Sequence, residues 1–115
     1  MSGLWILDGK TPRRCPDPIA WAQWIETADR QVARTELHSP GAPPVVISTV
    51  FLGIDHSFGR GAPVLFETMT FAPGDAEGQW RYRTWQEAEA GHAAVVASLR
   101  VVAMVDDLGK PPSVR

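Results

Sequence analysis

The stretch VVISTVFLGIDHSFGRGAPVLFETMTF, residues Val45 to Phe71, decides the fold. Two apolar runs, VVISTVFL and VLFETMTF, flank the connection Gly53 to Ala62. The first run is rich in β-branched residues and the second alternates apolar and polar residues, so we predict the central hairpin of an antiparallel sheet. The connection is longer than a hairpin needs, and a long connection in a small domain is often functional.

Further strands are predicted on both sides of this hairpin. Alternating side chains predict an edge strand at Arg30–Leu37 and a fourth strand at Gln79–Arg83. Leu4–Arg14 contains Asp8-Gly9, a dipeptide suited to a tight turn, and predicts a short N-terminal hairpin. The segment HSPGAPP, His38–Pro44, has three prolines and a glycine, which predicts a connection.

Two amphipathic helices are predicted. Asp17 and Pro18 supply the signals of a helix start, and the first helix is expected over Pro18–Ala28. Its apolar stripe consists of Trp21, Trp24, Ile25 and Ala28. This face is expected to pack in the core, with an aromatic ligand platform as the alternative.

The second helix is predicted to start at Thr84, which has capping-box spacing with Glu87. Its apolar stripe consists of Trp85, Ala88, His92, Val95, Val96 and Leu99. For Val101–Val105, periodicity leaves a continued helix and a short strand both open.

These elements predict an α+β fold: a four-stranded antiparallel sheet with two helices on one face, preceded by a short N-terminal hairpin. Residues 1–105 are expected to form a single domain, and residues 106–115 a flexible tail. The other sheet face would carry Trp80 and Tyr82, or Val64 and Phe66, and we expect a homodimer to cover it.

Composition excludes several classes of protein. The formal net charge of -2 gives no reason to expect nucleic-acid binding. No apolar run is long enough to span a membrane. Cys15 is the only cysteine, so an internal disulfide is excluded and a reducing, cytoplasmic setting is expected. No cofactor or metal motif is present.

Glu67 shares a strand face with Leu65, Met69 and Phe71, which is the more apolar face of that strand. If the helices cover this face, the carboxylate is buried and needs a partner. Candidate partners are Arg34, Arg81, Arg83 and His92. An ion pair is the ordinary interpretation, and a Glu67–His92 couple facing a pocket is the functional one.

The Gly53–Ala62 connection holds further candidates. His56 has the chemistry of a general base or a metal ligand, although it and Asp55 also suit ordinary backbone capping. Glycines 53, 59 and 61 with Ser57 and Arg60 suit a backbone nest for an anion. Aromatic and arginine side chains one strand away would complete a nucleotide-like site. The candidate ligand-binding residues are Asp55, His56, Ser57, Arg60, Glu67, Arg81, Tyr82, Arg83, Trp85 and His92.

Four segments together resemble a family of short uncharacterised proteins encoded by tailed phages and prophages. They are LDGK (Leu7–Lys10), STVFLGIDH (Ser48–His56), LFETM (Leu65–Met69) and RYRTWQEAEAGH (Arg81–His92). The resemblance covers about Leu4 to Leu99. It implies a phage origin, an accessory role and a place in the cytoplasm of the infected host bacterium, and it carries over no catalytic residue.

Three functions follow as hypotheses. The first is a non-enzymatic accessory protein that sequesters a small anionic or nucleotide-like ligand between Gly53–Ala62 and Arg81–Trp85, as a counter-defence protein would. The second is a protein-interaction module that inhibits a host complex. The third, which we favour least, is a small enzyme with Glu67, His56 and His92 as acid–base groups.

Overall fold

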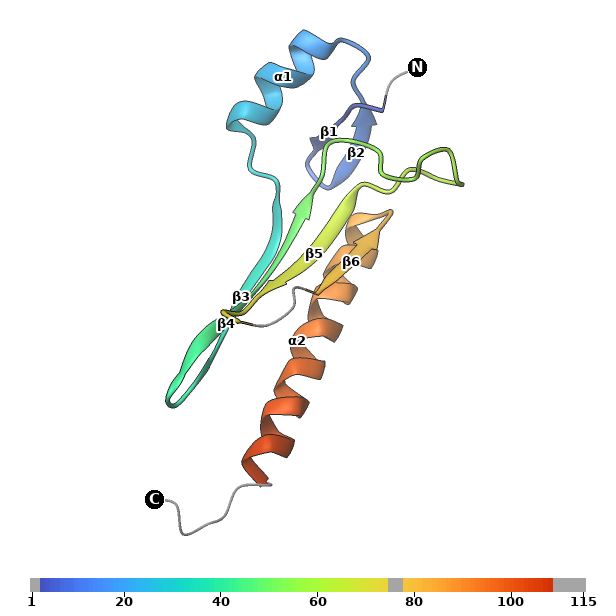
Figure 1. Ribbon diagram of the computed structural model, residues 1–115. Helices are drawn as coiled ribbons and strands as arrows, with labels where there is room; N and C mark the ends of the chain where they lie inside the picture. The colour runs from blue at the N-terminus through green and yellow to red at the C-terminus, as the bar shows by residue number, and fades with distance from the viewer. Residues whose placement is uncertain (1–2, 75–77, 109–115) are drawn as a thin grey trace.

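The structure is a computed structural model that describes residues 3–74 and 78–108, with side chains described as far as residue 100. The elements are β1 (Trp5–Asp8), β2 (Thr11–Arg14), α1 (Pro18–Thr27), β3 (Gln31–Ser39), β4 (Ala42–Phe51), β5 (Phe66–Phe71), β6 (Gln79–Tyr82) and α2 (Trp85–Leu108). They form an α+β fold, as predicted (Figure 1).

The described strands form two antiparallel sheets. β1 and β2 pair as the predicted N-terminal hairpin, and the larger sheet has the order β3-β4-β5-β6. β4 and β5 are the predicted central hairpin, paired from Val46 opposite Phe71 to Phe51 opposite Phe66. β6 completes the sheet, with Arg81 opposite Glu67.

The prediction that His38–Pro44 is a connection was wrong. Only Pro40 and Gly41 separate β3 from β4, with Gly41 at a φ of 74°. The β3–β4 hairpin runs past the end of β5, whose pairing with β4 begins only at Val46 (Figure 1). Pro43 and Pro44 are tolerated in this part of β4 because β5 makes no backbone pairs with it there.

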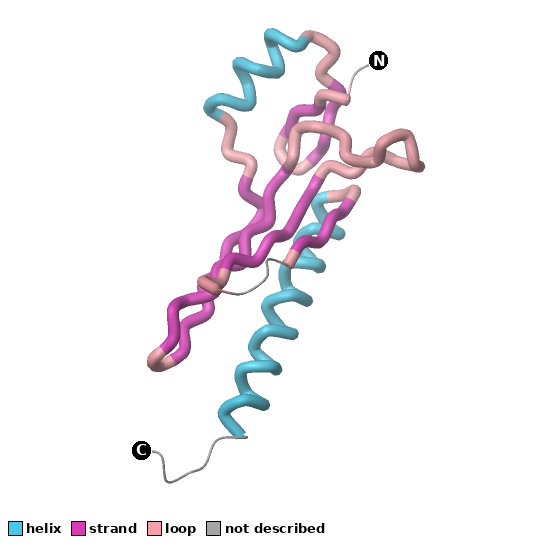
Figure 2. The backbone as a smooth tube through the Cα atoms, in the orientation of Figure 1, coloured by secondary structure: helices cyan, strands magenta, loops and turns pink. Residues whose placement is uncertain are grey.

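α2 covers one face of the four-stranded sheet. It contacts all four strands and runs alongside them (Figure 2). Alternate residues of β4 and β5 are fully buried on this face, and the α2 side chains that pack on it are also buried. The buried set is Ile47, Thr49, Phe51, Phe66 and Thr68 from the strands, and Ala88, His92, Val95 and Val96 from α2.

α1 lies against β1 and contributes to the end of the same core. Trp24 packs edge-on against Phe51 at 5.9 Å between ring centroids. Trp21 Nε1 donates to the carbonyls of Trp5 and Gly53, each at 3.0 Å. Gly53 has a φ of 78°, which favours glycine, and a Cβ there would lie 2.8 Å from Ile25 Cδ1 and displace the end of that side chain. The predicted apolar stripe of α1 therefore faces inward, although each of its residues is only half-buried.

The capping box of α2 forms as predicted. Glu87 N–H donates to Thr84 Oγ1 at 3.0 Å, and Thr84 N–H donates to Glu87 Oε1 at 3.2 Å. Residues 101–105 continue the helix, which ends at Leu108. Residues 109–115 of the expected tail lie outside the described residues. In the described part of the chain, no helix is long and apolar enough to cross a membrane.

The aromatic residues expected on the uncovered face were assigned wrongly. Phe66 and Tyr82 are opposite each other on β5 and β6, and both face α2. A Cβ on Gly91 of α2 would overlap the Tyr82 ring, so the ring lies directly against the helix backbone. Sequence alternation showed which residues share a face, and the position of α2 decides which face is buried.

Gly91→Ala should destabilise the protein although alanine is the better helix former. The added methyl must displace the Tyr82 ring, and overpacking of this kind costs about 1–3 kcal/mol. Urea unfolding measures the change, and Ala94→Gly on the exposed side of α2 is the control, with an expected loss of about 1 kcal/mol. A gain in the free energy of unfolding for Gly91→Ala would contradict the packing described.

Candidate functional site

Asp55 organises the Gly53–Ala62 loop. Its carboxylate accepts hydrogen bonds from Ser57 N–H at 2.8 Å, Ser57 Oγ at 3.0 Å and Val64 N–H at 3.0 Å. Burial raises the pKa of the Asp55 carboxyl, but the hydrogen bonds from Ser57 and Val64 outweigh burial, and the pKa lies below its usual value. The loop is therefore closed on an ionised carboxylate at neutral pH.

Arg83 attaches this loop to the end of β6. Its Nε donates to the carbonyl of Ala62 at 3.0 Å, and its Nη2 is 3.3 Å from the carbonyl of Arg60. The structure thus brings the Gly53–Ala62 loop beside the Arg81–Trp85 segment, the two parts of the expected ligand site. Because Arg83 donates to loop carbonyls, its role in the structure is to hold the loop in place.

The tip of the loop presents Phe58, which sequence reasoning did not select. Its side chain is 81% exposed, and its φ of 53° makes it the only non-glycine residue with positive φ in the described part of the chain. Gly59 and Gly61 also have positive φ, and Arg60 N–H donates to the Ser57 carbonyl at 3.0 Å. A phenylalanine directly before a glycine, in the middle of a long loop, was the sequence signal for this residue.

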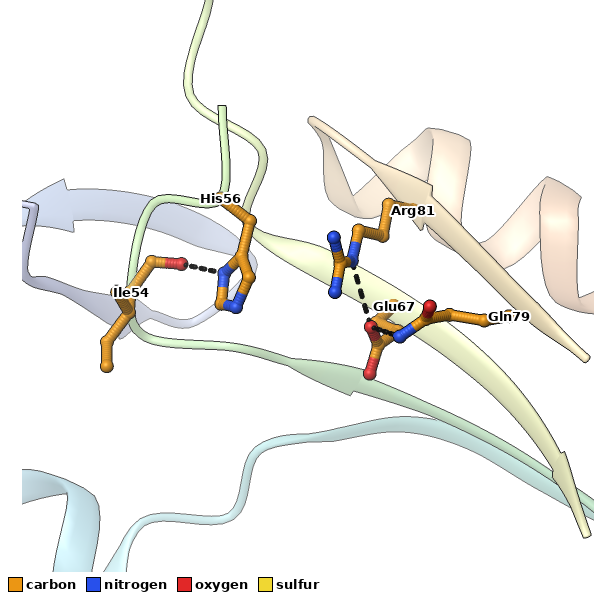
Figure 3. A network of polar contacts seen from close by, with 5 residues as sticks. All are labelled: Ile54, His56, Glu67, Gln79 and Arg81. Atoms are coloured by element: carbon orange, nitrogen blue, oxygen red, sulfur yellow. Dashed lines mark hydrogen bonds and ion pairs between the residues drawn. The ribbon is translucent and has the colours of Figure 1, made fainter. Parts of the chain in front are cut away.

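Glu67 forms a polar network with two residues of β6 (Figure 3). Its Oε2 accepts from Arg81 Nε at 3.0 Å and from Gln79 Nε2 at 2.6 Å. Glu67 is only 8% exposed, whereas the Arg81 side chain is 39% exposed. The ion pair expected from the sequence is confirmed, with Arg81 as the partner.

The alternative Glu67–His92 couple was wrong. α2 covers the face that carries Thr68, and Glu67 points to the opposite face. Thr68 bonds to Thr49, which bonds in turn to His92. The sheet therefore lies between Glu67 and His92, and the two side chains cannot work as one acid–base pair.

His56 lies between the loop tip and Arg81. Its Nδ1 donates to the Ile54 carbonyl at 2.8 Å, so in the neutral ring Nε2 carries the lone pair. Its imidazole is 6.2 Å from the Phe58 ring, measured between centroids. In Figure 3 the Arg81 guanidinium extends toward the side of the His56 ring, whose Nδ1 is directed the other way, at Ile54.

His92 is buried among threonines where α2 meets the sheet. Its Nε2 is 2.9 Å from Thr35 Oγ1, and its Nδ1 is 2.7 Å from Thr49 Oγ1. A neutral imidazole has one donor and one acceptor nitrogen, which two hydroxyls can satisfy. Burial lowers the pKa of His92 below its ordinary value of 6.5, so the neutral ring is favoured.

Tyr82 and Trp85 belong to the core rather than to an open stacking surface. Both pack against the buried cluster around Phe66, and Lys10 Nζ lies 5.6 Å from the centroid of the Trp85 ring. Within the described residues, the Tyr82 hydroxyl and Trp85 Nε1 are buried without a hydrogen-bond partner. The ten candidate residues thus form three groups. The loop residues lie together with Arg83, and Glu67 pairs with Arg81. Tyr82, Trp85 and His92 lie on the α2 side of the sheet.

Metal ligands do not gather in the parts of the chain that the structure describes: residues 3–74 and 78–108 contain no group of three or more His, Cys, Asp or Glu residues suited to a metal ion. No protein-family model, curated protein or solved structure matches this chain. The assignment of function therefore depends on the geometry of the loop and the sheet.

Because of His92, the free energy of unfolding should decrease as the pH is lowered below about 6.5. The unfolded chain binds a proton there at the ordinary pKa, and the folded protein binds it only at lower pH, so stability is full above 6.5 and declines below it. The slope should approach 1.4 kcal/mol per pH unit at most. Urea unfolding at several pH values measures it.

His92→Gln should flatten this slope, since glutamine can donate and accept but does not titrate. Ala94→Gly is the control, because it changes an exposed helix position without adding or removing a titratable group and should leave the slope of the wild type. An unchanged slope in His92→Gln would contradict the assignment of the pH dependence to His92.

Proposed function

We propose that this protein is a non-enzymatic binding protein that engages a protein partner through the Gly53–Ala62 loop. The single observation that carries the proposal is Phe58, an aromatic side chain 81% exposed at a loop tip in a left-handed backbone conformation. Such a conformation is disfavoured for a bulky residue and persists only where the surroundings impose it. Burial of an exposed aromatic side chain in a partner's pocket removes apolar surface from water, which favours binding.

The way the loop is held supports this proposal. The Asp55 carboxylate accepts hydrogen bonds from the backbone of Ser57 and Val64, and Arg83, directly after β6, donates to the Ala62 carbonyl. A loop already ordered before binding has less conformational entropy to lose when it binds, which favours affinity. Phe58 and the exposed Arg60 at its tip are residue types enriched at protein interfaces.

The chemistry of the tip defines the partner. Phe58 requires an apolar pocket, and Arg60 favours an acidic group at the rim of that pocket. The resemblance to phage proteins makes a protein of the infected bacterium's cytoplasm the candidate class. The enzyme hypothesis is weaker, because it needs Glu67 and His92 to act together and the sheet separates them.

Phe58→Ala should abolish binding of the partner, and Ile19→Ala should not. Ile19 is a large apolar side chain 70% exposed on α1, so the two variants lose similar exposed surface. Tagged wild type and both variants are expressed in the host bacterium, and co-purified proteins are quantified by mass spectrometry. We expect one protein in stoichiometric amount with wild type and Ile19→Ala, reduced at least about tenfold with Phe58→Ala. Equal amounts with all three proteins would contradict the proposal.

A small anionic ligand is the second candidate, and one observation favours it. Arg81 uses Nε for Glu67, and the rest of its guanidinium extends toward the side of the His56 ring (Figure 3). An anion between them would receive charge-assisted hydrogen bonds from the guanidinium. Such a ligand would lie beside the loop, where sequence analysis placed a nucleotide-like molecule.

This candidate predicts that nucleotides raise the melting temperature, because a ligand that binds only the folded state stabilises it. Arg81→Gln should abolish the shift while it still donates to Glu67, and Arg13→Ala, on the exposed N-terminal hairpin, should keep it. Differential scanning fluorimetry with a panel of mono- and dinucleotides measures the shift. A wild type that responds to none of them would exclude nucleotides as the ligand.

A further inference from the structure

The sheet face opposite α2 carries an apolar centre. β4 contributes Val46, Ser48 and Val50, and β5 contributes Met69 and Phe71; we call these five residues the open face. The register aligns them in rows across the two strands, with Val46 opposite Phe71 and Ser48 opposite Met69. Side chains directly opposite each other on neighbouring strands lie on the same face and in contact range. Phe71, the last residue of β5, is 42% exposed and lies beyond the part of β5 that pairs with β6.

Opposite charges flank the open face on both sides. On β3, Arg34 pairs with Glu36 at 2.7 Å, and these residues lie opposite Ser48 and Val46. On the other side, Arg81 of β6 pairs with Glu67 of β5 at 3.0 Å. The β3 edge therefore presents both Arg34 and Glu36, whereas the β6 edge presents mainly Arg81, because Glu67 is buried; apolar residues lie between the two edges.

We propose that the open face binds a second copy of this chain to form a two-fold symmetric dimer. A two-fold interface sets the same patch against itself, so it must be self-complementary. A face of one sign would repel its copy, whereas this face can place the acidic residue of one edge near the basic residue of the other edge. Burial of Phe71 and its apolar neighbours then stabilises the pair of sheets.

The dimer is independent of the loop proposed to bind the partner. Phe58 lies at the tip of the Gly53–Ala62 loop, and the centre of the open face lies along β4 and β5. Phe58→Ala should therefore leave the dimer intact. A monomeric wild type would overturn the dimer and leave the proposed partner binding untouched.

Phe71→Glu is the test, and Trp80→Glu is its matched control. Both residues are large, aromatic and 42% exposed, and they lie on opposite faces of the same sheet, since Trp80 is opposite Thr68 on the α2 side. Sedimentation velocity over a concentration series reports the mass of each protein. We expect dimers for wild type and Trp80→Glu, and a dissociation constant raised at least about tenfold for Phe71→Glu.

Circular dichroism checks that each variant folds, and Ser48→Arg tests the same face at its centre if Phe71→Glu does not fold. Three results would overturn the proposal: a wild type that stays monomeric at all concentrations, a dimer that neither open-face variant weakens, or a dimer that only Trp80→Glu weakens. The last would place the interface on the α2 side.

Discussion

The burial of one sheet face under α2 is the constraint on which the rest of this structure depends. Strand side chains alternate between two faces, so covering one face divides every strand into core and surface residues. Phe51 and Phe66 become core, and Glu67 is left on the other side. The capping box at Thr84 and the close contact of Gly91 with Tyr82 fix where α2 begins and how near it lies to β6.

Two surfaces remain outside this core. The Gly53–Ala62 loop connects the two strands of the central hairpin and is held by the Asp55 carboxylate within it and by Arg83, directly after β6. The open face lies on the side of the sheet away from α2. One surface is a single exposed aromatic on an ordered loop and suits insertion into a pocket. The other has apolar residues between edges that carry charges of both signs, and it suits a copy of itself. The two proposals assign separate roles to separate parts of the molecule.

The sequence was most informative where structure is local. Thr84 and Glu87 identified the start of α2 because a capping box is decided within four residues. The central hairpin followed from two runs with strong strand character. The prediction of a connection at HSPGAPP was wrong because Pro43 and Pro44 lie in a part of β4 that does not pair with β5. Whether prolines are tolerated there depends on where β5 ends, which the local sequence does not show.

The candidate site was harder to predict because it depends on long-range packing. Alternation placed Glu67 with Met69 and Phe71, but only the position of α2 shows that this face is open and that His92 is beyond reach. The Arg81 partner of Glu67 was among the sequence candidates, since it lies one strand away. The role of Arg83 toward the loop, and the exposure of Phe58, follow from a loop conformation that no local pattern specifies.

The most direct test of this account is a nuclear Overhauser spectrum that locates the His92 ring. If α2 covers the face described, the ring protons of His92 show contacts with the methyl groups of Thr35 and Thr49. Contacts from the His92 ring to the methyl group of Met69 would place α2 on the opposite face. That result would contradict the assignment of core and surface on which both proposed surfaces depend.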